Sequence, residues 1–153
     1  KSVTNVDSSA DVLELAKENV RLNGFTVNDQ DFVEADVFSE LRKLRAMKRT
    51  FDVIIADPPK LAQSQSQIDR AARAYKDLNL VSMQLLKPGG YLITFSCSGS
   101  ISTDLFQKIV FGAAVDAGRD MQIVERLSQS SDHPILLSFP ESEYLKGLVC
   151  RAI

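Results

Sequence analysis

Apolar and polar residues follow one another in short blocks that predict strands and helices in alternation. A strand-like run over 3–6 leads to Asp7-Ser8-Ser9, where a serine hydroxyl can accept a hydrogen bond from a free N–H of the next helix. Asn23-Gly24 predicts the left-handed end of that helix. Its apolar residues recur at helical spacing: Val12, Leu13, Ala16 and Val20. The chain therefore opens with a predicted strand–helix unit.

The alternation continues to the end of the sequence. Further strands are predicted over 31–37, 51–56, 91–95, 121–127 and 144–152, and further helices from Ser39 to about Lys48, from Ile68 to the turn at Lys87-Pro88-Gly89-Gly90, and from about Ser102 to Gly118. The strand over 51–56 is apolar almost throughout, which is typical of a strand buried on both faces of a parallel sheet. The last two strands have no helix between them and should pair antiparallel. The pattern predicts one α/β domain over 1–153, with a mostly parallel sheet and an antiparallel C-terminal hairpin.

Composition and charge narrow the class of protein. The 153 residues are 44% hydrophobic, which is enough for a sizeable core. With 18 basic and 20 acidic residues, the net charge of -2 gives no global reason to bind a polyanion. Cys97 and Cys150 form no CxxC pair, which argues against a disulfide framework or a bound metal. Two separate, reduced cysteines fit a cytoplasmic protein, and because no apolar run is long enough to span a bilayer, we expect no membrane partner.

Acidic residues follow the first two predicted strands, at the edge where open parallel sheets bind ligands. Asp7 follows the first strand, where a carboxylate can accept two hydrogen bonds from a ribose diol. Asp36 comes at the end of the second, where it could meet an exocyclic amine. Either carboxylate could instead cap the helix that follows it, so both interpretations stay open.

The next two strand ends carry a stronger signal. Asp57-Pro58-Pro59 follows the apolar strand 51–56, and its two prolines lock the backbone and remove two N–H donors. Because one proline would be enough to end a strand, this pattern indicates a site. Cys97 lies in the small-residue loop 96–102, before a helix whose N-terminus would favour a thiolate. The alternative is that Cys97 is an ordinary small buried residue.

Taken in chain order, these positions resemble the motifs of class I S-adenosylmethionine-dependent methyltransferases. Asp7, Asp36, Asp57-Pro58-Pro59-Lys60 and Lys87-Pro88-Gly89-Gly90 stand in the order of that superfamily over nearly the whole chain. Phe95-Ser96-Cys97-Ser98-Gly99 resembles the corresponding segment of the bacterial large-subunit ribosomal RNA cytosine-C5 methyltransferases that carry a PUA domain, the RlmI-like group. Its pairing with Asp57-Pro58-Pro59-Lys60 is specific to that group. The resemblance implies a Rossmann-like sheet, S-adenosylmethionine as cofactor and RNA, in particular ribosomal RNA, as substrate.

The resemblance also implies residue roles. Cys97 would be the nucleophile that adds to carbon 6 of cytosine, and Asp57 would hydrogen-bond the polar edge of the base. The implied cofactor-binding residues are Asp7, Ser8, Asp36, Val37, Asp57 and Pro58, and the implied substrate-binding residues are Pro58, Pro59 and Lys60. Lys60 could equally be a solvated charge. Cys150 is assigned to packing and His133 to a loop.

Basic residues on two predicted helices offer local RNA contacts despite the acidic total, although such clusters are commonly solvated helix faces. They are Arg42, Lys43, Arg45, Lys48, Arg49, Arg70, Arg73 and Lys76.

The start of the chain departs from the family. Such enzymes have a further strand and a glycine-rich turn ahead of the first strand seen here, and the RlmI-like group also has its PUA domain there. We therefore expect a piece of a longer protein that binds S-adenosylmethionine weakly or not at all by itself, with open strand edges that favour a homo-oligomer. Two other functions remain open: an exocyclic-amine methyltransferase in which Cys97 is incidental, and a non-catalytic α/β binding module.

Overall fold

A computed structural model describes residues 2–153, which form two compact units. The first unit runs up to Met47 and the second is Lys48–Ile153. Helices and strands alternate in both, and β1–β2 and β3–β4 are parallel pairs. The predicted α/β class is therefore confirmed.

The first unit contains a two-stranded parallel sheet and two helices. Its elements are β1 (Asn5–Asp7), α1 (Ala10–Leu22), η1 (Asp29–Asp31), β2 (Phe32–Glu34) and α2 (Val37–Ala46). Val6 lies opposite Val33 in the sheet. Ser9 begins α1, because its side chain accepts a hydrogen bond from the Val12 N–H at 3.4 Å. Gly24, at φ +77°, follows the end of this helix as predicted.

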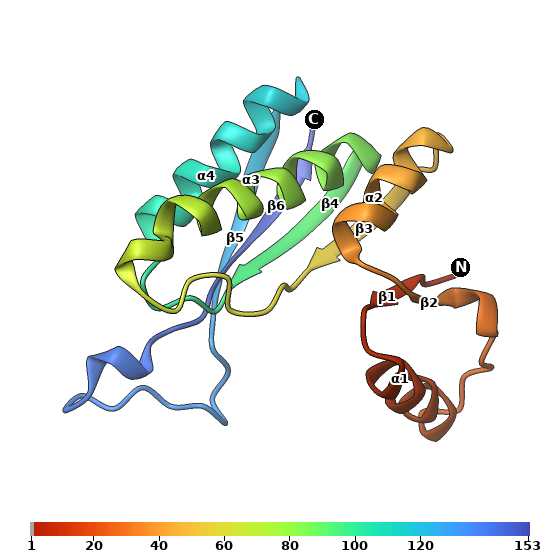
Figure 1. Cartoon of the computed structure of the whole chain (residues 1–153), viewed down its shortest axis with the longest axis horizontal. Helices are drawn as coiled ribbons and strands as arrows, with labels where there is room; N and C mark the ends of the chain where they lie inside the picture. Colours follow the sequence, from red (N-terminus) through yellow and green to blue (C-terminus); the bar gives the residue numbers. More distant parts are fainter. Residues whose placement is uncertain (1) are drawn as a thin grey trace. The chain divides into compact units, whose positions relative to one another are not determined.

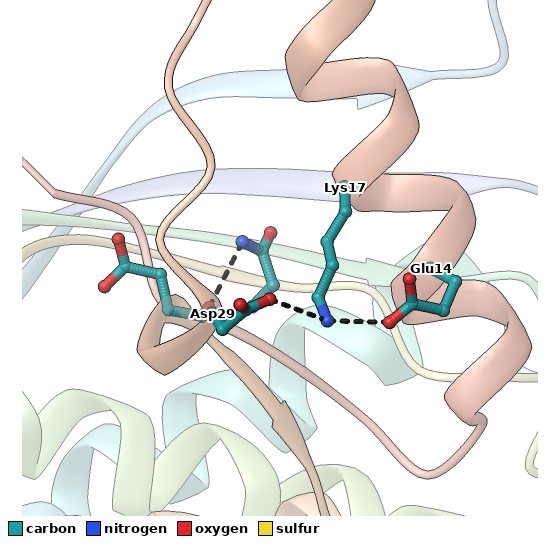
Figure 2. A network of polar contacts seen from close by, with 5 residues as sticks. Glu14, Lys17 and Asp29 are labelled. Carbon is teal, nitrogen blue, oxygen red and sulfur yellow. Dashed lines mark hydrogen bonds and ion pairs between the residues drawn. The ribbon is translucent and has the colours of Figure 1, made fainter.

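Lys17 connects α1 to the segment that precedes β2. Its Nζ lies 2.6 Å from Oε1 of Glu14 and 3.1 Å from Oδ1 of Asp29, and Figure 2 shows it between these two carboxylates. The ammonium group also lies over the ring of Phe32, 5.7 Å from its centroid. Hydrogen bonds to Glu14 and then Asp29 raise the pKa of Lys17.

Two boundaries of the first unit differ from the sequence prediction. The second strand was predicted over 31–37 but covers only Phe32–Glu34, because Val37 already belongs to α2. Asp36, not Ser39, begins that helix: Oδ1 of Asp36 accepts from both the N–H and the hydroxyl of Ser39, each at 2.9 Å. Both residues are good N-cap types, and the earlier one in the chain holds the position.

The second unit is a four-stranded sheet with two helices. Its elements are β3 (Phe51–Ala56), η2 (Gln65–Gln67), α3 (Ile68–Leu85), β4 (Leu86–Ser96), α4 (Thr103–Ala117), β5 (Met121–Ser128), η3 (Pro140–Ser142) and β6 (Lys146–Ala152). The strand order is β3-β4-β6-β5 (Figure 1). Because β6 is antiparallel to both neighbours, the predicted C-terminal hairpin is confirmed.

The core of this unit lies between α3, α4 and one face of the sheet. The two helices pack side by side (Figure 1), and Tyr75 of α3 meets Phe106 of α4 edge to face, with ring centroids 5.6 Å apart. Leu92 of β4 and its partner Cys150 of β6 are both buried. The apolar periodicity of the sequence thus identifies the packed faces of both helices.

The opposite face of the sheet is substantially exposed. Val53 and Ile55 of β3 are 50% and 66% exposed, and Tyr91 of β4 is 37% exposed. The prediction that β3 is buried on both faces is therefore wrong for this structure. Its apolar run also fits a strand covered on one face only, because β-branched residues favour strands wherever they lie.

The first part of β4 depends on two glycines. Residues 87–90 were predicted to end α3, but they lie within β4, and α3 ends at Leu85. Gly89 has φ +76°, and a Cβ on Gly90 would lie 3.0 Å from the backbone oxygens of Asp52 and Lys87. The close approach of β3 therefore requires glycine at position 90.

Candidate active site

Cys97 follows β4 directly and lies beside the loop that follows β3. Its Sγ is 3.9 Å from the carbonyl oxygen of Pro58, and the side chain is half-buried. β3 and β4 are neighbouring parallel strands, so their carboxyl ends meet at one edge of the sheet. The structure thus brings together two segments that are 39 residues apart.

A buried chain of hydroxyl groups fixes the residues on either side of Cys97. The Ser96 hydroxyl donates to the Tyr75 hydroxyl at 3.0 Å, and the Tyr75 and Ser98 hydroxyls are 3.1 Å apart. Ser98 Oγ also accepts from the Ala62 N–H at 3.1 Å. All four residues are fully buried. Because Ser96 and Ser98 point into the core, Cys97 between them points the other way, as alternation along an extended chain requires.

Lys146 holds the same loop from β6. Its Nζ donates to the carbonyl oxygens of Ser98 at 2.8 Å and Ile101 at 2.6 Å. Burial lowers the pKa of Lys146, while Cys97 and then Glu143 act in the opposite direction. Sequence reasoning missed Lys146, Tyr75 and Ser98 as site residues. Ser98 could have been found from its place next to Cys97. Lys146 could not, because it is 48 residues from Ser98 in the sequence.

The segment Asp57-Pro58-Pro59-Lys60 follows β3 and lies beside Cys97. Asp57, Pro59 and Lys60 are exposed, and Pro58 is half-buried against Cys97. Within residues 2–153 the Asp57 carboxylate makes no hydrogen bond or ion pair, so both oxygens can accept bonds from a ligand. A cysteine sulfur, an open carboxylate and a rigid backbone therefore lie at adjacent strand ends.

The cofactor candidates of the first unit lie at the carboxyl ends of its two strands. The Asp7 carbonyl accepts from the Ala35 N–H at 2.9 Å, which places Asp7 and the residues before α2 at one edge. Oδ1 of Asp7 accepts from the Ser9 N–H at 2.8 Å, and no described residue bonds its Oδ2. One carboxylate oxygen of Asp7 can therefore accept from a ribose hydroxyl, which fits the adenosyl group. Ser8 beside it is exposed.

Asp36 is occupied by its capping role. Hydrogen bonds from the Ser39 backbone and then from its hydroxyl hold the pKa of Asp36 below its usual range. Both bonds from Ser39 use Oδ1 of Asp36, and Val37 beside it is half-buried. The capping alternative is therefore observed for Asp36.

Other residues singled out by the sequence have structural contacts of their own or lie in a loop. Cys150 is buried, and burial raises its pKa to about 11, in keeping with a packing role. His133 is exposed in the loop between β5 and β6, 3.8 Å from Asp132. Of the basic residues, Lys43 pairs with Glu40 and Lys76 with Asp116, which favours structural roles for these two. No helix formed by residues 2–153 is long and apolar enough to cross a bilayer.

Two groups of known proteins resemble this chain. The large-subunit ribosomal RNA methyltransferase I of Shewanella amazonensis is 57% identical over 150 residues, 98% of this chain and 38% of that protein. The protein of the same name from Klebsiella pneumoniae strain 342 is 51% identical over all 153 residues, again 38% of its length. This chain therefore spans about two fifths of the length of these relatives.

A solved structure supports the fold. SMU.776, described as a candidate methyltransferase and solved with S-adenosylhomocysteine, superposes with a TM-score of 0.82 at 20% identity, over 98% of this chain and 39% of that one. The model of the S-adenosylmethionine-dependent methyltransferase family matches residues 1–150. A family match over nearly the whole chain, together with relatives above half identity, leaves one assignment: the chain belongs to the S-adenosylmethionine-dependent methyltransferases.

Proposed function

We propose that this chain is the catalytic part of an enzyme that methylates carbon 5 of cytosine in RNA through Cys97. The observation that carries the proposal is the 3.9 Å approach of the Cys97 sulfur to the Pro58 carbonyl, which joins the nucleophile to the Asp57–Lys60 segment. The alternative amine chemistry needs only the Asp57–Lys60 segment and gives no reason for a half-buried thiol beside it.

Carbon 5 of cytosine is a weak nucleophile and needs covalent activation. The Cys97 thiolate forms a bond to carbon 6, which moves an electron pair to carbon 5. S-adenosylmethionine supplies the methyl group that carbon 5 then accepts. A base removes the proton from carbon 5, the double bond between carbons 5 and 6 forms again, and the Cys97 sulfur leaves as thiolate.

Asp57 would hydrogen-bond the polar edge of the base and offset the charge that develops as the ring is attacked. Pro58, Pro59 and Lys60 would line the path of the substrate, because they continue from Asp57 at the edge that Cys97 faces. In the first unit, Asp7, Ser8, Asp36 and Val37 are the proposed cofactor-binding residues; in the second unit, Asp57 and Pro58 are. Asp7 would accept from its ribose through the oxygen that Ser9 leaves open.

The relatives at 51% and 57% identity are named for large-subunit ribosomal RNA, and we propose the same substrate class here. The base must lie in a single-stranded segment or be flipped out of its stack to reach the sulfur. Such an enzyme would act in the cytoplasm. We also infer self-association, because β3 is an apolar edge strand of its sheet with Ile55 66% exposed.

The test is a trapped reaction in the intact protein. RNA that carries 5-fluorocytosine has no proton on carbon 5 to lose, so methyl transfer should leave the RNA bound to Cys97. We expect an adduct that survives denaturing electrophoresis and maps to the Cys97 peptide. Cys97→Ser should abolish it, whereas Cys150→Ser, the matched change at the buried thiol, should retain it. If Cys97→Ala still transfers methyl groups, covalent catalysis is excluded and the amine alternative takes its place.

A further inference from the structure

Lys146 stands where β6 meets the end of β4. It lies opposite Ser96 on one side and opposite Ser128 on the other, at the start of the strand. From this position its side chain reaches over the loop that carries Cys97. The two carbonyl oxygens that it binds, at 2.8 Å on Ser98 and 2.6 Å on Ile101, are the two ends of one turn.

That turn is closed by its own backbone as well. The Ile101 N–H donates to the Ser98 carbonyl at 3.0 Å, so this oxygen accepts from both the turn and the lysine. Ser102 follows immediately and begins α4, accepting from the Leu105 N–H at 3.2 Å. The ammonium group therefore fixes the backbone that connects Cys97 to the N-terminus of α4.

The environment of Lys146 is unusual for a lysine. Its side chain is half-buried, and within residues 2–153 it makes no ion pair with a carboxylate. An ammonium group has three N–H donors, and the two carbonyls use two of them. Because partial burial of an unpaired charge is unfavourable, the lysine is a costly choice where only turn stability is needed. Cys97 and Glu143 are the groups that act electrostatically on it.

We propose that Lys146 is the positioning residue of Cys97: it holds the turn 98–101 through two carbonyls and keeps a positive charge near the sulfur. This inference rests on the proposed function, since it assigns a partner to the proposed nucleophile. The two sides of the Cys97 loop are held by different kinds of hydrogen bond. Tyr75 and Ser98 fix the loop from the core side by uncharged bonds, and Lys146 fixes it from the β6 side and brings a positive charge to it.

The reactivity of the thiol tests the charge directly, without RNA or cofactor. In the full chain, iodoacetamide near neutral pH should modify Cys97 and spare Cys150, whose pKa of about 11 keeps it a thiol. Peptide mass spectrometry separates the two. Lys146→Met should slow modification of Cys97 by about tenfold, and Lys146→Arg by no more than about threefold, because arginine keeps the charge and the donors. Lys108→Met, which removes an exposed α4 lysine, should leave the rate unchanged.

Lys146→Gln separates the effect of the charge from that of the hydrogen bonds. It also replaces Lys146→Met as the test if that variant folds poorly. Its amide can donate to a carbonyl but carries no charge, so circular dichroism should show a folded chain while modification stays slow. Modification of folded Lys146→Gln at the unchanged rate would overturn the inference. In the intact protein, Lys146→Gln should lower kcat for methyl transfer and leave KM for S-adenosylmethionine unchanged. If Cys97→Ala remains active, the proposed function is wrong. If Cys97 is essential but Lys146→Gln keeps full kcat, only the role of Lys146 is wrong.

Discussion

Buried hydroxyl groups near the site differ in whether they have partners, and this difference predicts opposite effects on stability. Ser98 Oγ accepts from the Ala62 N–H and bonds the Tyr75 hydroxyl, so Ser98→Ala leaves the buried Ala62 N–H without this partner and removes one of the two partners of Tyr75. We expect the free energy of unfolding to fall by about 1–3 kcal/mol. Urea denaturation followed by circular dichroism measures it.

Thr94, on β4 just before the loop that carries Ser98, provides the matched control. Its hydroxyl is fully buried and has no hydrogen-bond partner within residues 2–153. Thr94→Val keeps the shape and removes an unsatisfied polar group, so we expect stability to stay level or rise by about 1 kcal/mol. Equal losses in Ser98→Ala and Thr94→Val would show that the hydroxyl network contributes nothing specific.

At the residue scale, the sequence predicted positions set by local rules and missed those set by distant contacts. Cys97 and Asp57 stand directly after strands that their own apolar residues define, so their places at the sheet edge followed from order along the chain. The lysine that holds the Cys97 loop comes from β6, and only the antiparallel register of Ser96 with Lys146 brings it there. No local pattern fixes that register before the sheet is assembled.

At the element scale, amphipathic helices were predicted well and strand ends less well. Ile68–Leu85 and Thr103–Ala117 match the predicted helices because their apolar residues repeat over many turns and Gly118 ends the second. The short β2 lost residues at both ends, since a three-residue strand offers too few positions for alternation to define. Asp36 and Ser39 are both cap-type residues and stand three positions apart, so the sequence left the start of α2 ambiguous, and the hydrogen bonds of Asp36 decide it.

The junction of β3 and β4 depends on one glycine more than on any side chain around it. A Cβ at position 90 would lie 3.0 Å from two backbone oxygens, and backbone cannot move aside as a side chain can. Gly90→Ala should therefore lower the free energy of unfolding by about 1–3 kcal/mol in a chemical denaturation experiment. Gly99→Ala is the control, because a Cβ there meets nothing within 4 Å and its effect should be smaller.

At the scale of the whole molecule, the exposed face of the second sheet dominates the expected behaviour in solution. β3 is at the edge of the four-stranded sheet, and Val53 and Ile55 are 50% and 66% exposed on it. A free strand edge with apolar side chains is a template for pairing with another chain. The chain should therefore associate with itself as its concentration rises.

Sedimentation velocity over a concentration series measures this association, and two matched valines locate it. Val53→Lys puts a charge on the apolar edge strand, whereas Val115→Lys puts the same charge on α4, where the valine is 61% exposed on a helix without unpaired strand groups. Val53→Lys should shift the chain to monomer because a lysine on an edge strand opposes pairing, and Val115→Lys should sediment like the unchanged chain. If both variants reduce association equally, general apolar exposure drives it and β3 has no special part. If the unchanged chain is monomeric at every concentration, the open edge of β3 is protected by other means, and the inferred homo-oligomer is wrong.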